Sequence, residues 1–158
     1  MLYTAMVNLH TLAADAAQKA GQILLKYYKN TYEIHDKGYH NPVTTADHEA
    51  DAFLKQFLME ATPEYGWLSE ETVDSPERLD KEFVWIVDPL DGTKEFIEGI
   101  PHFVTSIGLA QNGIPILGVL YNPVTEELIR TDQDGVVWYQ DQKAVLCQET
   151  LLKDVGCL

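Results

Sequence analysis

Cysteine and long apolar runs are scarce in this sequence of 158 residues. The two cysteines, Cys147 and Cys157, lie near its end without the spacing of a metal or redox motif, so we expect reduced thiols and no disulfide framework. No segment approaches the roughly 18 apolar residues of a membrane span, and no basic region precedes an apolar core at the N-terminus. These absences predict a cytoplasmic protein without a membrane anchor.

Positive charge is also in short supply. Eleven Lys and Arg residues stand against 25 Asp and Glu residues, which gives a formal net charge of -14. Such a chain is poorly suited to bind the phosphate backbone of a nucleic acid or an anionic lipid surface. The simplest interpretation of the acidity is solubility. A sharper one is that an anionic substrate needs a cation to bind here.

The composition is otherwise that of a folded globular protein. Hydrophobic residues make up 46% of the chain, and 158 residues are enough to bury a core. No repeat, low-complexity tract or linker marks an internal boundary. Residues 1–158 are therefore predicted to form a single domain.

Two segments near the start have the apolar spacing of helices. Apolar residues between Leu9 and Tyr28 recur at i, i+3, i+4 and i+7, which predicts a helix with one buried stripe. The pattern returns from Ala50 to Ala61 and ends at Pro63. The polar, glycine-containing segment HDKGYHNP between them is predicted to be a loop.

The period changes after the second helix to short runs rich in aromatic and β-branched residues, which predict strands. Turn signals at residues 112–113, 122–123 and 134–135 indicate that the later strands are sequential and largely antiparallel. We expect an α+β fold with the two helices covering one face of the sheet. The predicted strands are YGWLSEE, FVWIVDP, HFVTSIGLA, IPILGVLY, EELIRT and VVWYQ.

The second of these strands ends in a cluster of acids. Phe83–Val87 is apolar without alternation, which predicts a central strand buried on both faces. Asp88 and Asp91 are three residues apart, so on a continuing strand they would point to opposite faces. They converge only if the backbone turns between them. Pro89 and Gly92 are residues that favour such a turn.

Convergent carboxylates indicate a metal site. Thr93 is predicted to be the N-cap of a short helix through KEFIEG, whose free N–H groups favour phosphate. Two carboxylates beside an anion repel it unless a divalent cation lies between them, and hard oxygen ligands suit Mg²⁺. Asp88 is expected to bridge two ions, with Asp91 on one of them and the Leu90 carbonyl on the other.

Other acids have competing explanations. Glu70 of the SEE segment follows a neighbouring predicted strand and is the expected further ligand, with Glu71 as the alternative. Asp47 belongs to Thr44-x-x-Asp47, a capping-box pattern at the start of the second helix, and capping alone explains it. Taken alone, Glu70, Asp88 or Asp91 is better explained as a solvated loop residue or helix cap at the end of a strand, but their combination weakens that explanation.

Two other acidic motifs are excluded by spacing. Haloacid-dehalogenase-type phosphatases use D-x-D-G-T with the first Asp as nucleophile, but Pro89 stands two residues before Asp91 here. An EF-hand needs acids at alternate loop positions, which DPLDGTKEFIEG does not have.

Three ordered motifs, NPVTTAD, SEE and WIVDPLDGTKEF, resemble the inositol monophosphatase family of Mg²⁺-dependent, lithium-sensitive phosphomonoesterases. The match covers residues 37–140 in detail. The wording DPLDGTKEF, followed by GIPILGVLYNPV, is most similar to the branch of 3'(2'),5'-bisphosphate nucleotidases and less like the D-G-T-x-N-F of typical inositol monophosphatases.

The resemblance implies a reaction and a role for each site residue. The expected reaction is hydrolysis of 3'-phosphoadenosine 5'-phosphate to AMP and phosphate, with inositol phosphates and sugar bisphosphates as alternative substrates. Asp47 and Thr93 would orient and deprotonate the attacking water, and the N–H groups of Gly92 and Thr93 would hold the phosphate. Two or three Mg²⁺ ions would be held by Glu70, Asp88, the Leu90 carbonyl and Asp91.

The chain also departs from the family pattern. Family members continue into a second half with a W-D-x-A-A-G-like motif whose Asp completes the metal site, but no tryptophan follows Trp138 here. The chain is expected to be either part of a longer enzyme, which we favour, or a shortened relative that lacks part of the active site. We therefore expect the first half of an αβαβα sandwich, of reduced or no activity alone, whose uncovered sheet surface drives formation of a homo-oligomer or another association. The rival functions are an inactive structural or regulatory partner of a full-length homologue, and a cation binder without catalysis.

Overall fold

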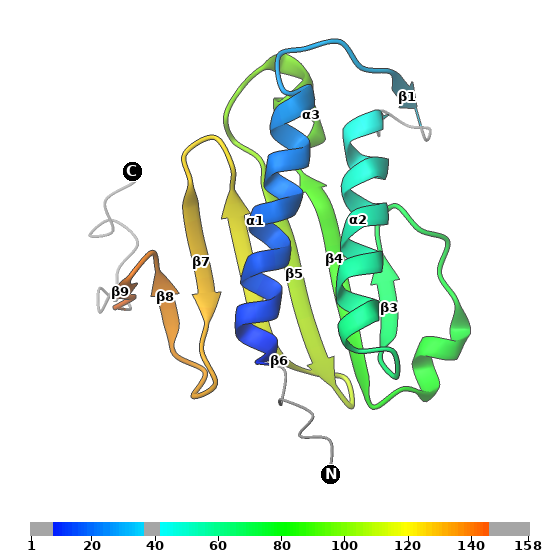
Figure 1. Ribbon diagram of the computed structural model, residues 1–158, viewed down its shortest axis with the longest axis vertical. Helices are drawn as coiled ribbons and strands as arrows, with labels where there is room; N and C mark the ends of the chain where they lie inside the picture. The colour runs from blue at the N-terminus through cyan, green and yellow to red at the C-terminus, as the bar shows by residue number, and fades with distance from the viewer. Residues whose placement is uncertain (1–7, 37–41, 146–158) are drawn as a thin grey trace, which may run out of the picture.

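The computed structural model of the chain describes residues 8–36 and 42–145 (Figure 1). Cys147 and Cys157, for which reduced thiols are expected, lie outside the described residues. Within those residues, no helix combines the length and the apolar character needed to cross a membrane.

Both predicted helices are confirmed, and each begins at a side-chain cap. Helix α1 spans Leu9–Tyr27, and the Asn8 side chain accepts hydrogen bonds from the backbone N–H groups of His10 and Thr11. Helix α2 spans Thr45–Ala61 and starts with the predicted capping box between Thr44 and Asp47. It ends just before Pro63, where the sequence pattern predicted its end.

A seven-stranded sheet follows, with its strands in sequence order. Each neighbouring pair is antiparallel except β3 and β4, which are parallel because the segment between them, including a 3₁₀ helix at Pro76–Asp80, returns to the other end of the sheet. The prediction of sequential, largely antiparallel strands is confirmed. The strands are β3 (Gly66–Ser69), β4 (Phe83–Asp91), β5 (Val104–Gln111), β6 (Ile114–Asn122), β7 (Glu127–Thr131), β8 (Val137–Tyr139) and β9 (Gln142–Lys143).

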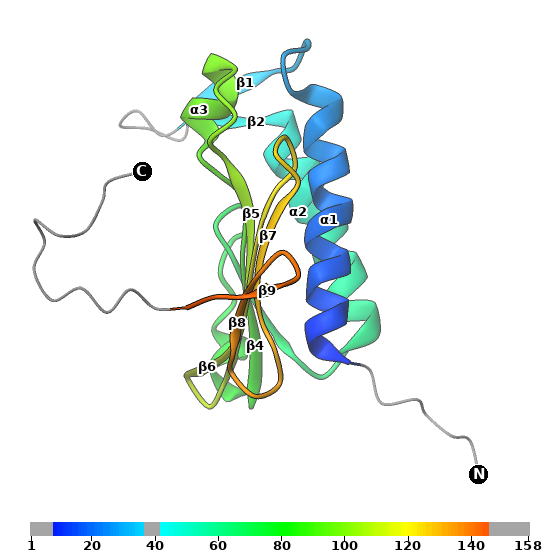
Figure 2. The ribbon, with the colours of Figure 1, turned by 90° about the vertical axis from the view of Figure 1, so that its left-hand side faces the viewer.

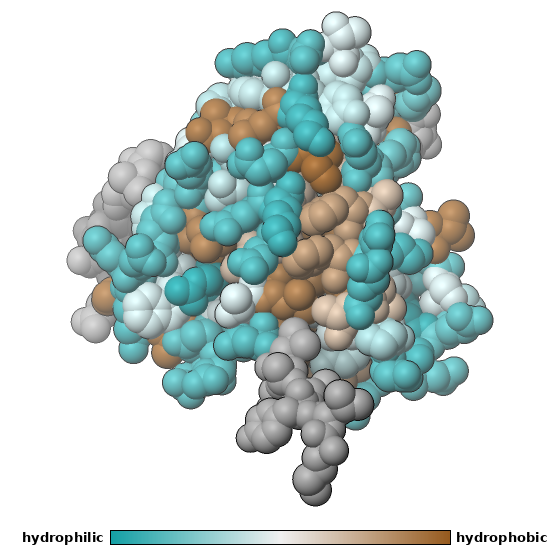
Figure 3. Space-filling view, viewed as in Figure 1, coloured by the Kyte–Doolittle hydropathy of each residue, from teal (hydrophilic) through white to brown (hydrophobic). Residues whose placement is uncertain are grey.

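Helices α1 and α2 lie side by side on one face of this sheet, as expected (Figure 2). Buried alanines along α1 let the helix approach the strands closely, and a Cβ atom on Gly21 would lie only 2.7 Å from the Tyr121 ring. The outer surface of the helices is largely hydrophilic, with an apolar band between them (Figure 3). The core therefore lies between the helix pair and the sheet.

The opposite face of the sheet is not covered by the described residues, and we call it the open face. Along β4, Trp85 and Val87 are buried under the helices, whereas Ile86 between them is 45% exposed. The expectation that Phe83–Val87 is buried on both faces is therefore wrong for this structure. Apolar and polar residues do not alternate along Phe83–Val87 because Ile86, which lies on the open face, is itself apolar.

A shallow hollow of about 410 Å³ lies on the open face. Its floor contains Gly108 and Gly118, which are cross-strand partners on β5 and β6 and present no side chains. Leu120 and Ile129, partners on β6 and β7, are each partly exposed at its rim. The open face thus has the composition of a surface that packs against protein.

Part of the predicted loop between the helices is a strand pair instead. Strand β1 (Ile34–Asp36) pairs antiparallel with β2 (Pro42–Thr44). Thr45 N donates to the Glu33 carbonyl at 3.2 Å, so the pair is joined to the start of α2. The hydrophobic pattern did not predict these strands because each has only three residues.

Candidate active site

A β-bulge in β4 brings Asp88 and Asp91 to the same face of the sheet. Asp88 pairs with Ser106 on β5, and Asp91 pairs with Val104, so three steps on β4 match two steps on β5. Residues three apart on a regular strand point to opposite faces, but the extra residue of the bulge places Asp88 and Asp91 on the same face. The bulge is held by the Thr105 hydroxyl, which is buried and donates to the Pro89 carbonyl at 3.1 Å.

The backbone then turns sharply into a short helix. Gly92 has φ of +100°, and a Cβ atom there would lie 2.7 Å from the His102 carbonyl oxygen. Gly92 is therefore the N-cap of helix α3, which spans Thr93–Glu98. The prediction of Thr93 as N-cap is wrong, because the left-handed residue is Gly92 and the Thr93 hydroxyl faces Asp47 instead.

Aromatic packing fixes α3 against the core. Phe96 of α3 is fully buried, and its ring contacts those of Tyr28, Tyr32 and Phe103. The Tyr28 hydroxyl also donates to the Gly99 carbonyl, just beyond the helix, at 2.6 Å. Rigid support of this kind holds the first turn of α3 next to Asp91.

Asp47 both caps α2 and contacts Thr93. Its side chain is 1% exposed, and Oδ2 accepts hydrogen bonds from the N–H and the hydroxyl of Thr44 at 2.7 and 2.6 Å. Oδ1 lies 3.1 Å from Thr93 Oγ1, which is also 3.0 Å from the Leu90 carbonyl oxygen. A hydroxyl has one proton, so Thr93 donates to one of these acceptors at a time and keeps lone pairs for a water molecule.

Glu70 closes the site from the side of β3. It follows Ser69 directly, and its N–H donates to the Val87 carbonyl at 3.2 Å, which places it beside Asp88. A cavity of about 200 Å³ is lined by all the predicted site residues except the catalytic candidate Asp47. Its lining residues are Pro42, Glu70, Asp88, Leu90, Asp91, Gly92, Thr93, Lys94 and Glu95.

Burial and the neighbouring acids raise the pKa of Asp88 from its ordinary 3.8 to about 7. Desolvation is the largest cause, followed by the hydrogen bond and the negative charge of Glu70, and Asp91 adds to the effect. The Leu90 N–H, which donates to Asp88 Oδ1 at 3.0 Å, opposes it only in part. Asp88 is thus partly protonated near neutral pH in the metal-free chain, and a bound cation would favour its ionised form.

The sequence as a whole matches the profile described as the inositol monophosphatase family over residues 6–155. The chain belongs to this family. The motif resemblance is thereby confirmed, with Asp47, Glu70, Asp88, Asp91 and Thr93 gathered at one end of the sheet.

Individual relatives show how much of the family's length is present. The inositol-1-monophosphatase of Mesorhizobium japonicum is 35% identical over 161 residues, covering 99% of this chain and 59% of the relative. That of Caulobacter vibrioides is 43% identical over 117 residues, covering 72% and 45%. Among solved structures, the extragenic suppressor protein suhB of Bartonella henselae has a TM-score of 0.82 at 31% identity, covering 89% of this chain and 55% of that one. The chain spans about half the length of these relatives.

The donor atoms at the cavity beside Asp88 are oxygens of the kind that Mg²⁺ binds. Asp88, Asp91 and Glu70 supply carboxylates and Leu90 a carbonyl. Across residues 8–36 and 42–145, however, no group of three or more Asp, Glu, His or Cys side chains is arranged around one point. The residues present thus fit a partial coordination shell, in which water or substrate oxygens take other positions, as Mg²⁺ commonly allows.

Sequence reasoning missed two residues in or near the cavity. Lys94 is the one cationic side chain among the described residues that line the cavity. Asp51, one helical turn after Asp47, is 7% exposed and accepts hydrogen bonds from the hydroxyls of Ser69 and Thr72. The available signal for Asp51 was an acid on the buried stripe of α2, where charged residues are rare unless paired.

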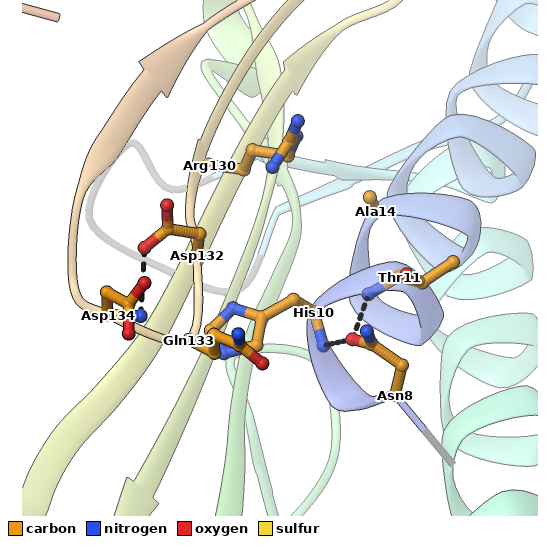
Figure 4. Close-up of a pocket in the computed structure, with 8 residues that line it drawn as sticks. All are labelled: Asn8, His10, Thr11, Ala14, Arg130, Asp132, Gln133 and Asp134. Atoms are coloured by element: carbon orange, nitrogen blue, oxygen red, sulfur yellow. Dashed lines mark hydrogen bonds between the residues drawn. The ribbon is translucent and has the colours of Figure 1, made fainter. Parts of the chain in front are cut away.

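A second cavity, of about 440 Å³, lies between the first turn of α1 and the turn between β7 and β8 (Figure 4). It contains none of the family's predicted site residues. The carboxylate of Asp132 in its wall accepts hydrogen bonds from the N–H groups of Asp134 and Val136 and from Trp138 Nε1. Those bonds stabilise the turn, so this cavity has a structural explanation.

Proposed function

We propose that this chain provides the part of a Mg²⁺-dependent phosphomonoester hydrolase that binds metal, orients water and holds phosphate. The observation that carries the proposal is the contact between Asp47 and Thr93 beside the cavity that Glu70, Asp88 and Asp91 line. Unaided hydrolysis of phosphate monoesters is extremely slow, so clustered positive charge is expected to provide most of the rate enhancement.

Each residue has a defined task in this reaction. Thr93 accepts a hydrogen bond from the attacking water, and Asp47 Oδ1 receives the Thr93 proton as the water loses its own. The backbone N–H groups of Gly92 and Thr93 hold the phosphate, because the first N–H groups of a helix lack intrahelical acceptors. Glu70, Asp88, Asp91 and the Leu90 carbonyl would hold Mg²⁺, which would lower the pKa of water and neutralise phosphoryl charge. No side chain becomes phosphorylated.

Two substrate classes are supported by different observations. Lys94, in the lining of an otherwise acidic cavity, favours a substrate with a second phosphate, such as 3'-phosphoadenosine 5'-phosphate, in line with the DPLDGTKEF wording. The similarity to inositol-1-monophosphatases favours inositol 1-phosphate. A Lys94→Met variant separates them. It is expected to lower kcat/KM for the bisphosphate about tenfold more than for inositol 1-phosphate, the effect of losing one charge-assisted hydrogen bond.

The 158-residue chain is proposed to bind Mg²⁺ but to turn over slowly. Its resemblance to the family implies that a further Asp ligand belongs to a motif it does not contain. The open face supports association with a second copy of the chain. If the chain has no hydrolytic role, the same face would support a structural or regulatory function, in which it binds an intact homologue.

The deciding experiment measures Mg²⁺ binding by calorimetry and phosphate release from both substrates, using the purified chain and its Asp88→Asn variant. We expect Mg²⁺ binding that the variant loses, with slow Mg²⁺-dependent release from at least one substrate. Binding without any release would leave a cation-binding protein. Absence of both would overturn the proposal.

A further inference from the structure

Asp51 is a buried carboxylate that no proposed catalytic step uses. It lies on α2 one turn after Asp47, and both of its oxygens accept hydrogen bonds from hydroxyl groups, one at the last residue of β3 and one just beyond it. Ser69 donates to Oδ1, and Thr72 donates to Oδ2 at 2.5 Å. We propose that Asp51 is a positioning residue that fixes the turn Ser69–Thr72 and thereby presents Glu70 to the metal site.

The burial of Asp51 shows that these bonds matter energetically. Its side chain is only 7% exposed, and a carboxylate removed from water is strongly unfavourable unless its oxygens are hydrogen-bonded. Bonds to an ionised carboxylate are also about twice as strong as bonds between neutral groups. The two hydroxyls that stabilise the charge come from positions on either side of Glu70, so the turn is held at both ends.

The hydrogen bonds continue from Asp51 into the backbone of the turn. Ser69 Oγ donates to Asp51 and accepts from the Glu71 N–H at 3.2 Å. The Glu70 N–H is bound separately to the Val87 carbonyl of β4, next to Asp88. Glu70 therefore lies between two anchors, one on the sheet and one on α2. Loss of the Asp51 anchor would leave the turn attached on one side only.

The same helix thus supports both halves of the proposed chemistry. Asp47 and Asp51 are i and i+4 on α2 and lie on the same side of it, one toward Thr93 and one toward the turn of Glu70. A rigid helix that carries both residues keeps the water-orienting pair and the metal-binding turn in a constant relation. This inference rests on the proposed function for the metal-binding role of Glu70. The contacts of Asp51 with the turn do not depend on that role.

The test compares Asp51→Asn and Thr72→Val with a control at the other end of α2. Thr62→Val removes the buried hydrogen bond from Trp85 Nε1 to Thr62 Oγ1, of 2.9 Å, far from the turn. We expect Asp51→Asn to weaken Mg²⁺ binding about 10- to 100-fold, the usual effect of removing a residue that orients a metal ligand. Thr72→Val should weaken it less, and Thr62→Val should lower stability without changing the Mg²⁺ affinity.

Activity gives a second readout that a purely structural role would not change. In Asp51→Asn, saturating Mg²⁺ should restore phosphate release, whereas in Asp47→Asn it should not. The proposal is overturned if both Asp51→Asn and Thr72→Val bind Mg²⁺ as tightly as the original chain. If Asp51→Asn does not fold, Thr72→Val alone decides, and an unchanged Mg²⁺ affinity in that variant overturns the proposal.

Amide hydrogen exchange separates this inference from the proposed function. If the original chain binds no Mg²⁺, the proposed function fails, but Asp51→Asn should still accelerate exchange at the Glu71 N–H relative to Thr62→Val. Equal exchange rates in these two variants would overturn the role of Asp51 in holding the turn.

Discussion

Oδ1 of Asp47 lies 3.1 Å from Oγ1 of Thr93, although 46 positions separate them in the chain. The other oxygen of the same carboxylate caps α2 through Thr44. Because the carboxylate of Asp47 caps α2, its position relative to the helix is fixed. The hydroxyl of Thr93 therefore faces an acceptor that is held in place. The capping and catalytic explanations of Asp47 are therefore compatible, since each uses a different oxygen.

Removing the hydroxyl of Thr93 tests this pair. Thr93→Val is expected to lower the rate of phosphate release about 10²- to 10⁴-fold, the range for loss of positioned proton transfer. Thr93→Ser keeps the hydroxyl and should retain most of the rate. Single-turnover release of phosphate at saturating Mg²⁺ is the measurement. Equal rates in the Val and Ser variants would contradict the role of the hydroxyl.

Gly92 provides a prediction about stability. In Gly92→Ala the new methyl group would meet the His102 carbonyl in addition to the strain of a positive φ. Gly113→Ala is a matched control, because Gly113 has φ of +79° and open space around its Cβ position. Urea unfolding should show a loss of about 1 kcal/mol for Gly113→Ala from backbone strain alone.

The loss for Gly92→Ala should be clearly larger, because the His102 carbonyl belongs to the backbone and moves only with the segment that leads into β5. Phosphate binding should weaken in the same variant. If both alanine variants lose the same stability, the close contact at Gly92 has no energetic consequence.

Local patterns in the sequence predicted the features that depend on neighbouring residues. Apolar spacing predicted α1 and α2, and Thr44-x-x-Asp47 predicted the start of α2. Turn signals predicted the order of the later strands. These features could be predicted because each follows from contacts within a few residues or from the period of one element.

Other features depend on tertiary contacts that no local pattern records. The spacing of Asp88 and Asp91 required a departure from a regular strand, but only pairing with β5 shows that it is a β-bulge. The parallel pairing of β3 and β4 depends on the path of the intervening segment. The partners of Asp51 come from a turn 18 and 21 positions further along the chain, so its role could not be predicted.

The raised pKa of Asp88 predicts a pH dependence of stability in the metal-free chain. The pKa is about 7 in the folded state and near 3.8 when Asp88 is exposed, so between these values the folded chain binds more protons than the unfolded one. The free energy of unfolding should therefore fall as pH rises from about 4 to 7. Asp88 is partly exposed, and screening limits the change to about 1 kcal/mol, or 2–4 °C in Tm.

Asp88→Asn should abolish this decrease and raise the Tm of the metal-free chain at pH 8. Asp15→Asn, at an exposed position on α1, is the control and should leave the pH profile unchanged. Thermal unfolding in the presence of a chelator measures both variants. A profile for Asp88→Asn that runs parallel to that of the original chain would contradict the prediction.

The open face predicts association of the chain with itself. Leu120 is 38% exposed beside the glycine floor of the hollow, and burying such apolar area is favourable at about 25 cal/mol per Å². Sedimentation at micromolar concentration should show a dimer or larger species, and Leu120→Asp should shift it toward the monomer.

Ile114→Asp is the control, because Ile114 is 67% exposed at the start of β6 but does not line the hollow. Because β5 and β6 present glycines there, the partner surface must project side chains into the hollow. A monomeric original chain, or equal dissociation by both substitutions, would show that the open face is not the site of association.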